Sequence, residues 1–173
     1  MIEFDFFKKN EKNNEDEFMN KIYSRRSFIN KLDFNCEYLN KYLIECIMAY
    51  LSSIYKQNSS LCKKYLSQIF FENTHKEIED NKKRFKYSKS YINIVNAELQ
   101  NQTIETINYV SHIVISVEVA AIYNQQNIFT GTIKKIEENY EESIEFIFEN
   151  NGWKINNILK QNYKSINDTI IKF

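Results

Sequence analysis

Residues with acid–base chemistry are scattered along this 173-residue chain. The two histidines are His75, placed four residues before Glu79, and His112, at the start of a strand-like stretch. General acid–base catalysis needs two such groups within hydrogen-bond reach, and the aspartates fall in termini, helix caps and connections. The sequence therefore predicts no catalytic residue. Three strand carboxylates have a position from which they can line a pocket, although none has an evident partner: Glu98, Glu118 and Glu145.

The remaining reactive residue types exclude several other chemistries. Gly131 and Gly152 are the only glycines, so a Gly-rich phosphate-binding loop cannot form. Cys36, Cys46 and Cys62 are odd in number and lack a C-x-x-C pair, which indicates reduced core thiols instead of a disulfide or zinc site. We therefore predict no metal and no cofactor, and a cytoplasmic or equivalent reducing compartment.

Charge gives no general attraction to nucleic acid, because Lys and Arg balance Asp and Glu at 23 each. Residues 82–89 interleave basic side chains with Phe85 and Tyr87, a composition that can hold a single strand by charge and stacking. Acidic residues at 77–80 directly precede this run. We interpret the run as a solvated connection and expect no nucleic-acid partner.

Two regions of helical periodicity are expected to position these groups. Apolar residues recur at three- and four-residue steps from Cys36 to Ile54, which predicts an amphipathic helix over about 36–56. A polar break at 57–60 precedes a second helix over about 61–75, whose pattern can continue, increasingly polar, to about Glu79. Residues 1–17 are charged and Asn-rich and are predicted to be a flexible leader, whereas residues 18–173 are predicted to form a single domain.

Residues 18–32 form a further helical pattern with a basic surface. One interpretation is an amphipathic helix that contacts an anionic membrane or an acidic partner. The other is an ordinary first helix that packs on its own domain with its charges in water. The basic face consists of Lys21, Arg25, Arg26 and Lys31.

From Tyr91 onward the periodicity changes to that of strands. Period-two alternation predicts strands over 91–99, 112–123, 142–149 and 153–160, with 103–110 also extended. A short edge strand is expected at 129–133, charged connections at 80–89 and 134–141, and a final short helix in the tail from Ile166. The predicted fold is α+β, with N-terminal helices packed on a curved antiparallel sheet of about four strands that forms a cone. The side chain of Glu118 is expected on the solvent face of that sheet.

This order of elements resembles the cone-shaped superfamily typified by nuclear transport factor two. Within it the chain is most similar to the C-terminal domain of the peripheral scaffold subunit of the mitochondrial inner-membrane protein translocase and its bacterial relatives. The resemblance implies a membrane-peripheral scaffold with a basic amphipathic helix and a hydrophobic pocket. It covers residues 18–160 and rests on the helices 36–56 and 61–75, the strand His112–Tyr123, the Phe-rich strand 143–148 and the Gly152-Trp153-Lys154-Ile155 ending.

We therefore expect a non-catalytic binding or scaffold domain, peripheral to a membrane protein-transport or secretion complex. Its partner is a protein, a second copy of the chain, or an anionic membrane surface. The alternative is a small-molecule enzyme of the same fold, of dehydratase, isomerase or cyclase type, which requires a buried carboxylate or His facing a cavity. A ligand or partner would enter between the sheet and helix 36–56, against residues that core packing explains equally well: Leu43, Tyr50, Val114, Phe146 and Trp153.

Overall fold

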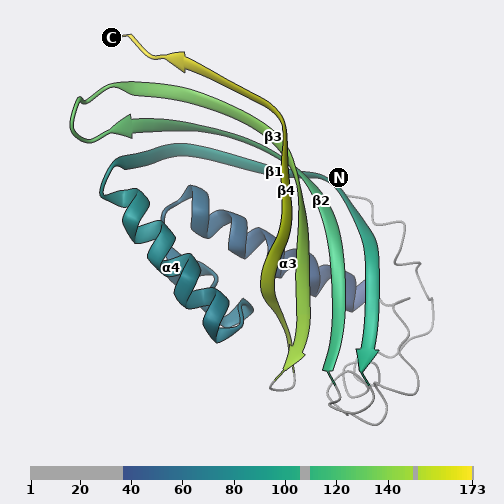
Figure 1. Ribbon diagram of the computed structural model, residues 1–173. Coiled ribbons are helices and arrows are strands. Elements are labelled where there is room, and N and C mark those ends of the chain that lie inside the picture. Colours follow the sequence, from purple (N-terminus) through teal and green to yellow (C-terminus); the bar gives the residue numbers. More distant parts are fainter. Residues whose placement is uncertain (1–36, 106–109, 150–151, 173) are drawn as a thin grey trace.

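The computed structural model describes residues 37–105, 110–149 and 152–172 (Figure 1). It confirms the predicted α+β class, since within these ranges two α-helices lie against a four-stranded antiparallel sheet. The leader 1–17 and the basic stretch 18–32 lie outside the described residues. In chain order the elements are α3 (Glu37–Tyr55), the 3₁₀ turns η1 (Ser59–Leu61) and η2 (Lys63–Tyr65), α4 (Gln68–Lys82), β1 (Phe85–Glu105), β2 (Val110–Asn127), β3 (Ile133–Glu149) and β4 (Gly152–Ile170).

Helix α3 confirms the helix predicted over 36–56. Its apolar residues recur on one face, and Leu43, Ile47 and Leu51 are buried against the concave side of the sheet. An apolar stripe of this kind stabilises a helix chiefly through packing, because most helical stability in proteins comes from burial of the amphipathic face and less from intrinsic propensity. The stripe therefore fixes which face of α3 meets the strands.

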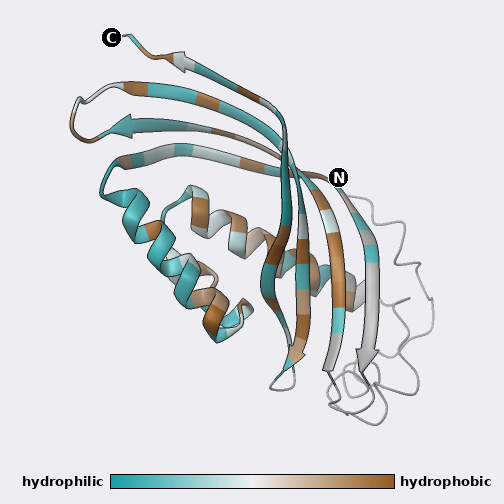
Figure 2. Ribbon diagram, viewed as in Figure 1, coloured by the Kyte–Doolittle hydropathy of each residue, from teal (hydrophilic) through white to brown (hydrophobic). Residues whose placement is uncertain are grey.

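The sheet is a simple meander in the order β1-β2-β3-β4. Along β2, residues at odd positions from Ile113 to Tyr123 are buried and the even ones are not, as the period-two pattern predicts. Most of the buried residues pair with buried residues of β3, for example Ile115 with Ile144, whereas Ala121 pairs with the half-buried Glu138. Figure 2 shows hydrophobic residues on β2, β3 and β4 where these strands pass α3, and a largely hydrophilic α4.

Register shifts bend the two outer strands. The pairing of β1 with β2 shifts at three places, and the pairing of β4 with β3 shifts at three others. Each shift adds local twist and bends the strand that carries the extra residue. The long strands accordingly curve around α3 (Figure 1).

The two charged connections predicted at 80–89 and 134–141 are wrong. Helix α4 continues to Lys82 and β1 begins at Phe85 after only two residues. Strand β3 already begins at Ile133, because inward-facing Ile136 and Tyr140 are buried between polar neighbours that point outward. The many charges had concealed a period-two strand.

Three other boundaries also differ from expectation. The helix predicted from Leu61 is replaced by two 3₁₀ turns, and α4 starts at Gln68, after Leu66 forms a parallel bridge with Ile155. Residues 129–131 lie in the turn between β2 and β3 instead of forming an edge strand. The predicted tail helix is the end of β4, which pairs with β3 as far as Ile170.

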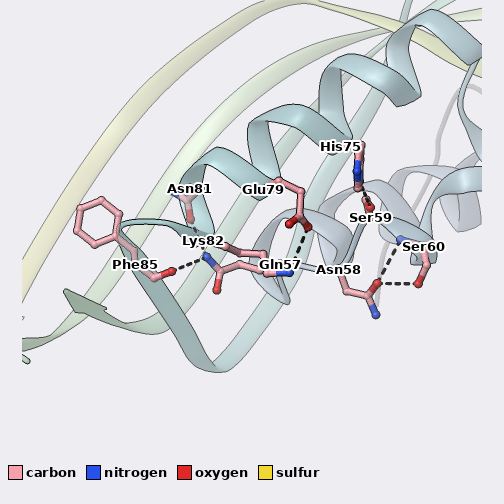
Figure 3. Close-up of polar contacts among 9 residues, drawn as sticks. All are labelled: Gln57, Asn58, Ser59, Ser60, His75, Glu79, Asn81, Lys82 and Phe85. Atoms are coloured by element: carbon pink, nitrogen blue, oxygen red, sulfur yellow. Dashed lines mark hydrogen bonds and ion pairs between the residues drawn. The ribbon is translucent and has the colours of Figure 1, made fainter. Parts of the chain in front are cut away.

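A side-chain clamp joins the ends of both helices to β1 (Figure 3). Gln57 lies just after α3 with a φ of 52°, a left-handed conformation that is uncommon for a residue with a Cβ. Its Nε2 donates to Asn81 Oδ1 at 2.7 Å and to the carbonyl of Phe85 at 2.9 Å, while its Oε1 accepts from the backbone N–H of Tyr87 at 2.8 Å. One amide thereby fixes α3, α4 and the first residues of β1 relative to one another.

Candidate ligand-binding cavity

A cavity of about 230 Å³ lies between the C-terminal half of α3, helix α4 and the concave face of the sheet. Most of its lining side chains carry a phenol or a carboxylate, which is unusual for space adjoining a hydrophobic core. The described residues that line it are Tyr50, Leu51, Ile54, Tyr55, Glu77, Tyr87, Tyr123, Glu138, Tyr140, Glu142, Gln161 and Tyr163.

Glu142 is the most deeply buried carboxylate of the wall, with only 3% of its surface exposed. Its Oε1 accepts a hydrogen bond of 2.7 Å from Gln161 Nε2, whereas its Oε2 has no hydrogen-bond partner among the described residues. Burial disfavours the charged form and raises the pKa of Glu142 to about 7, with the Gln161 hydrogen bond opposing the shift. The carboxyl group therefore titrates near neutral pH.

Glu138 is the centre of a network of tyrosine hydroxyls. Its Oε2 accepts from the Tyr55 hydroxyl at 2.8 Å, and its Oε1 accepts from the Tyr123 hydroxyl at 2.9 Å. The Tyr55 hydroxyl also lies 2.8 Å from that of Tyr140. Burial raises the pKa of all three tyrosines well above the ordinary range, so they stay protonated and act as donors.

The pleat of β3 places these groups on one wall. Ile136, Glu138, Tyr140 and Glu142 alternate with outward residues, so all four face α3. Register then brings β4 residues beside them, because Tyr140 pairs with Tyr163 and Glu142 pairs with Gln161. The rings of Tyr140 and Tyr163 lie 5.2 Å apart.

The Gln57 clamp positions the part of the wall that β1 supplies. Asn81, which accepts from Gln57, donates through Nδ2 to the Tyr87 hydroxyl at 3.2 Å. The ring of Tyr87 lies 4.7 Å from that of Tyr123, and the ring of Tyr55 lies 5.2 Å from the same partner. Helix ends and strand side chains thus hold the aromatic wall together.

The pocket residues predicted from sequence are distributed over several environments. Leu43, Phe146 and Trp153 are at most 1% exposed and belong to the hydrophobic core. Tyr50 lines the cavity, and Val114 is half-buried between the inward residues Ile113 and Ile115, so it points to the other face of β2. Their contact with a ligand or partner stays a prediction, as does that of the basic face 21–31, which lies outside the described residues.

The titratable residues singled out from sequence do not line this cavity. His75 is exposed and its Nδ1 lies 2.7 Å from Ser59 Oγ (Figure 3). His112 is half-buried, and Glu98 is exposed. On the outer face of the sheet, Glu118 forms an ion pair of 3.2 Å with Lys164, and Glu145 accepts from Asn156.

Sequence reasoning missed the two strand carboxylates that do face the cavity. Glu138 fell in the presumed connection, and Glu142 was taken only as part of a strand pattern. The available signal was the spacing of Ile136, Tyr140 and Ile144, which extends the inward face of β3 back through both glutamates. No cluster of three or more potential metal ligands occurs in the described ranges.

The fold defines a class of α+β domains in which helices pack on the concave side of an antiparallel meander. One solved structure of this class is the intermembrane space region of the chloroplast protein ARC6, with a TM-score of 0.52 and 9% sequence identity over 75% of this chain and 98% of that one. At this identity the likeness concerns the fold alone. No protein-family model matches the chain, and no curated protein matches it. Membership of the nuclear transport factor two-like superfamily therefore stays a prediction.

Within the described residues no helix is both long and apolar enough to cross a membrane.

Proposed function

We propose that this domain is a non-catalytic binding domain whose cavity takes up a small polar molecule. The observation that carries this proposal is the second oxygen of Glu142, which is buried in the wall of the cavity without a hydrogen-bond partner among the described residues. Buried polar atoms are nearly always hydrogen-bonded. A bound molecule that donates to this oxygen satisfies it.

The surrounding network supports the same proposal. Placing carboxylates and phenols in a wall destabilises a fold relative to apolar side chains unless their hydrogen bonds are made. Here the wall is held rigid by bonds to Gln161, Tyr55 and Tyr123 before any ligand binds. A preorganised site loses less entropy on binding than a flexible one.

Native mass spectrometry of the protein isolated from its own host tests the proposed function. We expect a small-molecule mass on the intact protein that is released when the protein unfolds. The substitution Glu142→Gln should reduce its occupancy, whereas Glu137→Gln on the outer face of the same strand should leave it unchanged. A bare mass, together with no thermal stabilisation by a screen of cationic, neutral and anionic small molecules, would exclude the proposal.

A second candidate function is acid–base catalysis of a dehydratase or isomerase type. The observation that favours it is the pKa of Glu142, raised to about 7 by burial, which suits proton transfer at neutral pH. The tyrosine hydroxyls of the wall are the accompanying donors. Incubation of the isolated ligand with the protein in D₂O tests it: deuterium at a carbon atom, lost in Glu142→Gln and kept in Glu137→Gln, supports catalysis, and no exchange contradicts it.

The scaffold role at a membrane transport complex stays a prediction that rests on residues outside the described ranges. It requires that the full chain bind anionic vesicles, and that reversal of the four charges at Lys21, Arg25, Arg26 and Lys31 abolish binding. Equal binding to neutral vesicles would contradict it.

A homodimer across the sheet is likewise a prediction, for which sedimentation velocity is the test.

A further inference from the structure

We propose that the molecule taken up by this cavity is a small protonated amine, held by N–H donation to Glu142 Oε2. This inference rests on the binding function proposed above and specifies the chemical class of its ligand. The described part of the lining contains three glutamates, Glu77, Glu138 and Glu142, and no Lys, Arg or His. Such a wall attracts cations and disfavours anions.

Hydrogen-bonding roles point to a donor. The unpartnered atom of Glu142 is a buried carboxylate oxygen, and an ionised carboxylate can accept hydrogen bonds but cannot donate them. Glu138 is already satisfied at both oxygens by tyrosine hydroxyls. A charge-assisted N–H···O bond is about twice as strong as a neutral one, so an ammonium group is the donor that gains most from this position.

The aromatic content of the wall favours the same ligand. Six tyrosines are among the described lining residues, and the negative face of an aromatic ring attracts cations within about 6 Å of its centroid. Leu51 and Ile54 of α3 offer apolar surface to a short carbon chain. At about 230 Å³, the cavity suits a small ligand instead of a drug-sized one.

A lipid headgroup would bring a phosphate together with its amine. The described lining has no positive side chain to compensate that phosphate, and the three glutamates repel it. We therefore assign the cavity to a free amine and not to a phosphorylated one. Ethanolamine and phosphoethanolamine differ only in the phosphate. A comparison of their affinities therefore distinguishes a free amine from a lipid headgroup.

Binding should be coupled to proton release from Glu142. An ammonium ion needs the carboxylate form, and burial holds the pKa of the empty site at about 7. Affinity should therefore rise about tenfold per pH unit up to pH 7 and then level off, since an alkylamine remains protonated to about pH 10. The other polar groups that line the same cavity are Tyr50 and Tyr55 on α3, Glu77 on α4, Tyr87 on β1, Tyr123 on β2, Glu138 and Tyr140 on β3, and Gln161 and Tyr163 on β4.

NMR titration of the full chain at pH 8 with n-butylammonium, butan-1-ol and butyrate tests the assignment. These probes share a four-carbon chain and differ in charge. We expect butylammonium to bind at least tenfold more tightly than butan-1-ol, and butyrate to bind least. Glu142→Gln should weaken butylammonium at least tenfold without affecting butan-1-ol, and Glu137→Gln, which also removes one charge, should change neither. Circular dichroism confirms that both variants are folded.

The outcomes distinguish this inference from the proposed function. If butan-1-ol or butyrate binds as tightly as butylammonium, or if Glu142→Gln leaves butylammonium binding intact, the amine assignment is overturned while the cavity remains a binding site. If phosphoethanolamine binds more tightly than ethanolamine, the free-amine assignment is overturned. If no probe of any charge binds, both the inference and the binding function are overturned.

Discussion

The Tyr55 hydroxyl, on the last residue of α3, lies 2.8 Å from the Tyr140 hydroxyl on the inner face of β3. Tyr55 also donates to Glu138 at 2.8 Å. A phenol has one proton, so Tyr140 donates to Tyr55 while Tyr55 donates to Glu138. The same chain of bonds joins the helix to the sheet and orders the wall of the cavity.

Removal of either hydroxyl should destabilise the domain. We expect Tyr140→Phe to lower the free energy of unfolding by about 1–2 kcal/mol, because one buried bond is lost. Tyr55→Phe should cost about 2–3 kcal/mol because Glu138 also loses a donor. In urea denaturation the double variant should lose less unfolding free energy than the two single variants lose in total, since Tyr55 and Tyr140 share a hydrogen bond. Tyr91→Phe, at a residue 67% exposed, is the control. Strict additivity would contradict the shared bond.

The Gln57 clamp predicts an unusual order of stabilities. Gln57→Ala and Gln57→Gly both remove three hydrogen bonds and should each destabilise the domain by about 2–4 kcal/mol. Gly adopts the φ of 52° without steric conflict, whereas Ala does not. The free energy of unfolding of Gln57→Gly should therefore exceed that of Gln57→Ala by about 1 kcal/mol. Gln57→Gly should accordingly unfold at a higher urea concentration. The reverse order would show that the left-handed backbone is not retained.

The predictable part of the fold is the part whose packing is apolar. The stripe of α3 and the alternation of β2 each report one buried face, and both elements were located correctly. Strand β3 was predicted only from Glu142 onward, because before that point its inward positions include Glu138 and its outward positions are mostly charged. The distal half of β4 is exposed on both faces, so it has no hydrophobic alternation to detect.

The same reasoning explains why the cavity was missed. A polar group at an inward strand position interrupts the hydrophobic pattern, and functional sites are where such local rules tend to be broken. The glutamates that make the wall chemically distinctive are thus the residues that concealed it. Partners such as Gln161, whose bond to Glu142 depends on β3–β4 register, need the tertiary structure to be found.

The described cysteines should resist modification in the native protein. Cys46 and Cys62 are buried free thiols, and burial raises the pKa of Cys46 to about 12. Because the thiolate is the reactive form, a Cys36→Ser variant should show almost no reaction with an aromatic disulfide reagent at pH 8. In guanidinium the same variant should react at both remaining cysteines and release two equivalents of the aromatic thiol per chain. Rapid native labelling would indicate that the packing of α3 opens readily.

Glu142 should make the folded state less stable as pH rises toward neutrality. Its pKa is about 7 in the folded protein against an ordinary value of 4.5. Below about pH 4.5 the group is protonated in both states, and its stabilising effect is fully present. Between pH 4.5 and 7 the unfolded chain releases the proton while the folded chain retains it, so stability is lost through this window. The total loss corresponds to about 3 kcal/mol.

A variant isolates this contribution from those of all other groups. Glu142→Gln stays neutral at every pH and keeps an acceptor for Gln161 Nε2. Its stability should therefore not fall between pH 4.5 and 7, and it should be more stable than the natural protein at pH 8. The difference between their urea unfolding free energies should be near zero at pH 4 and grow to its plateau just above pH 7. Glu137→Gln, which removes a charge from an exposed ion pair with Lys135, should shift the profile by less than about 1 kcal/mol without this shape. Parallel profiles for Glu142→Gln and the natural protein would mean that Glu142 ionises in the folded state as it does in water, and that the cavity admits enough solvent to remove the basis for proton-coupled amine binding.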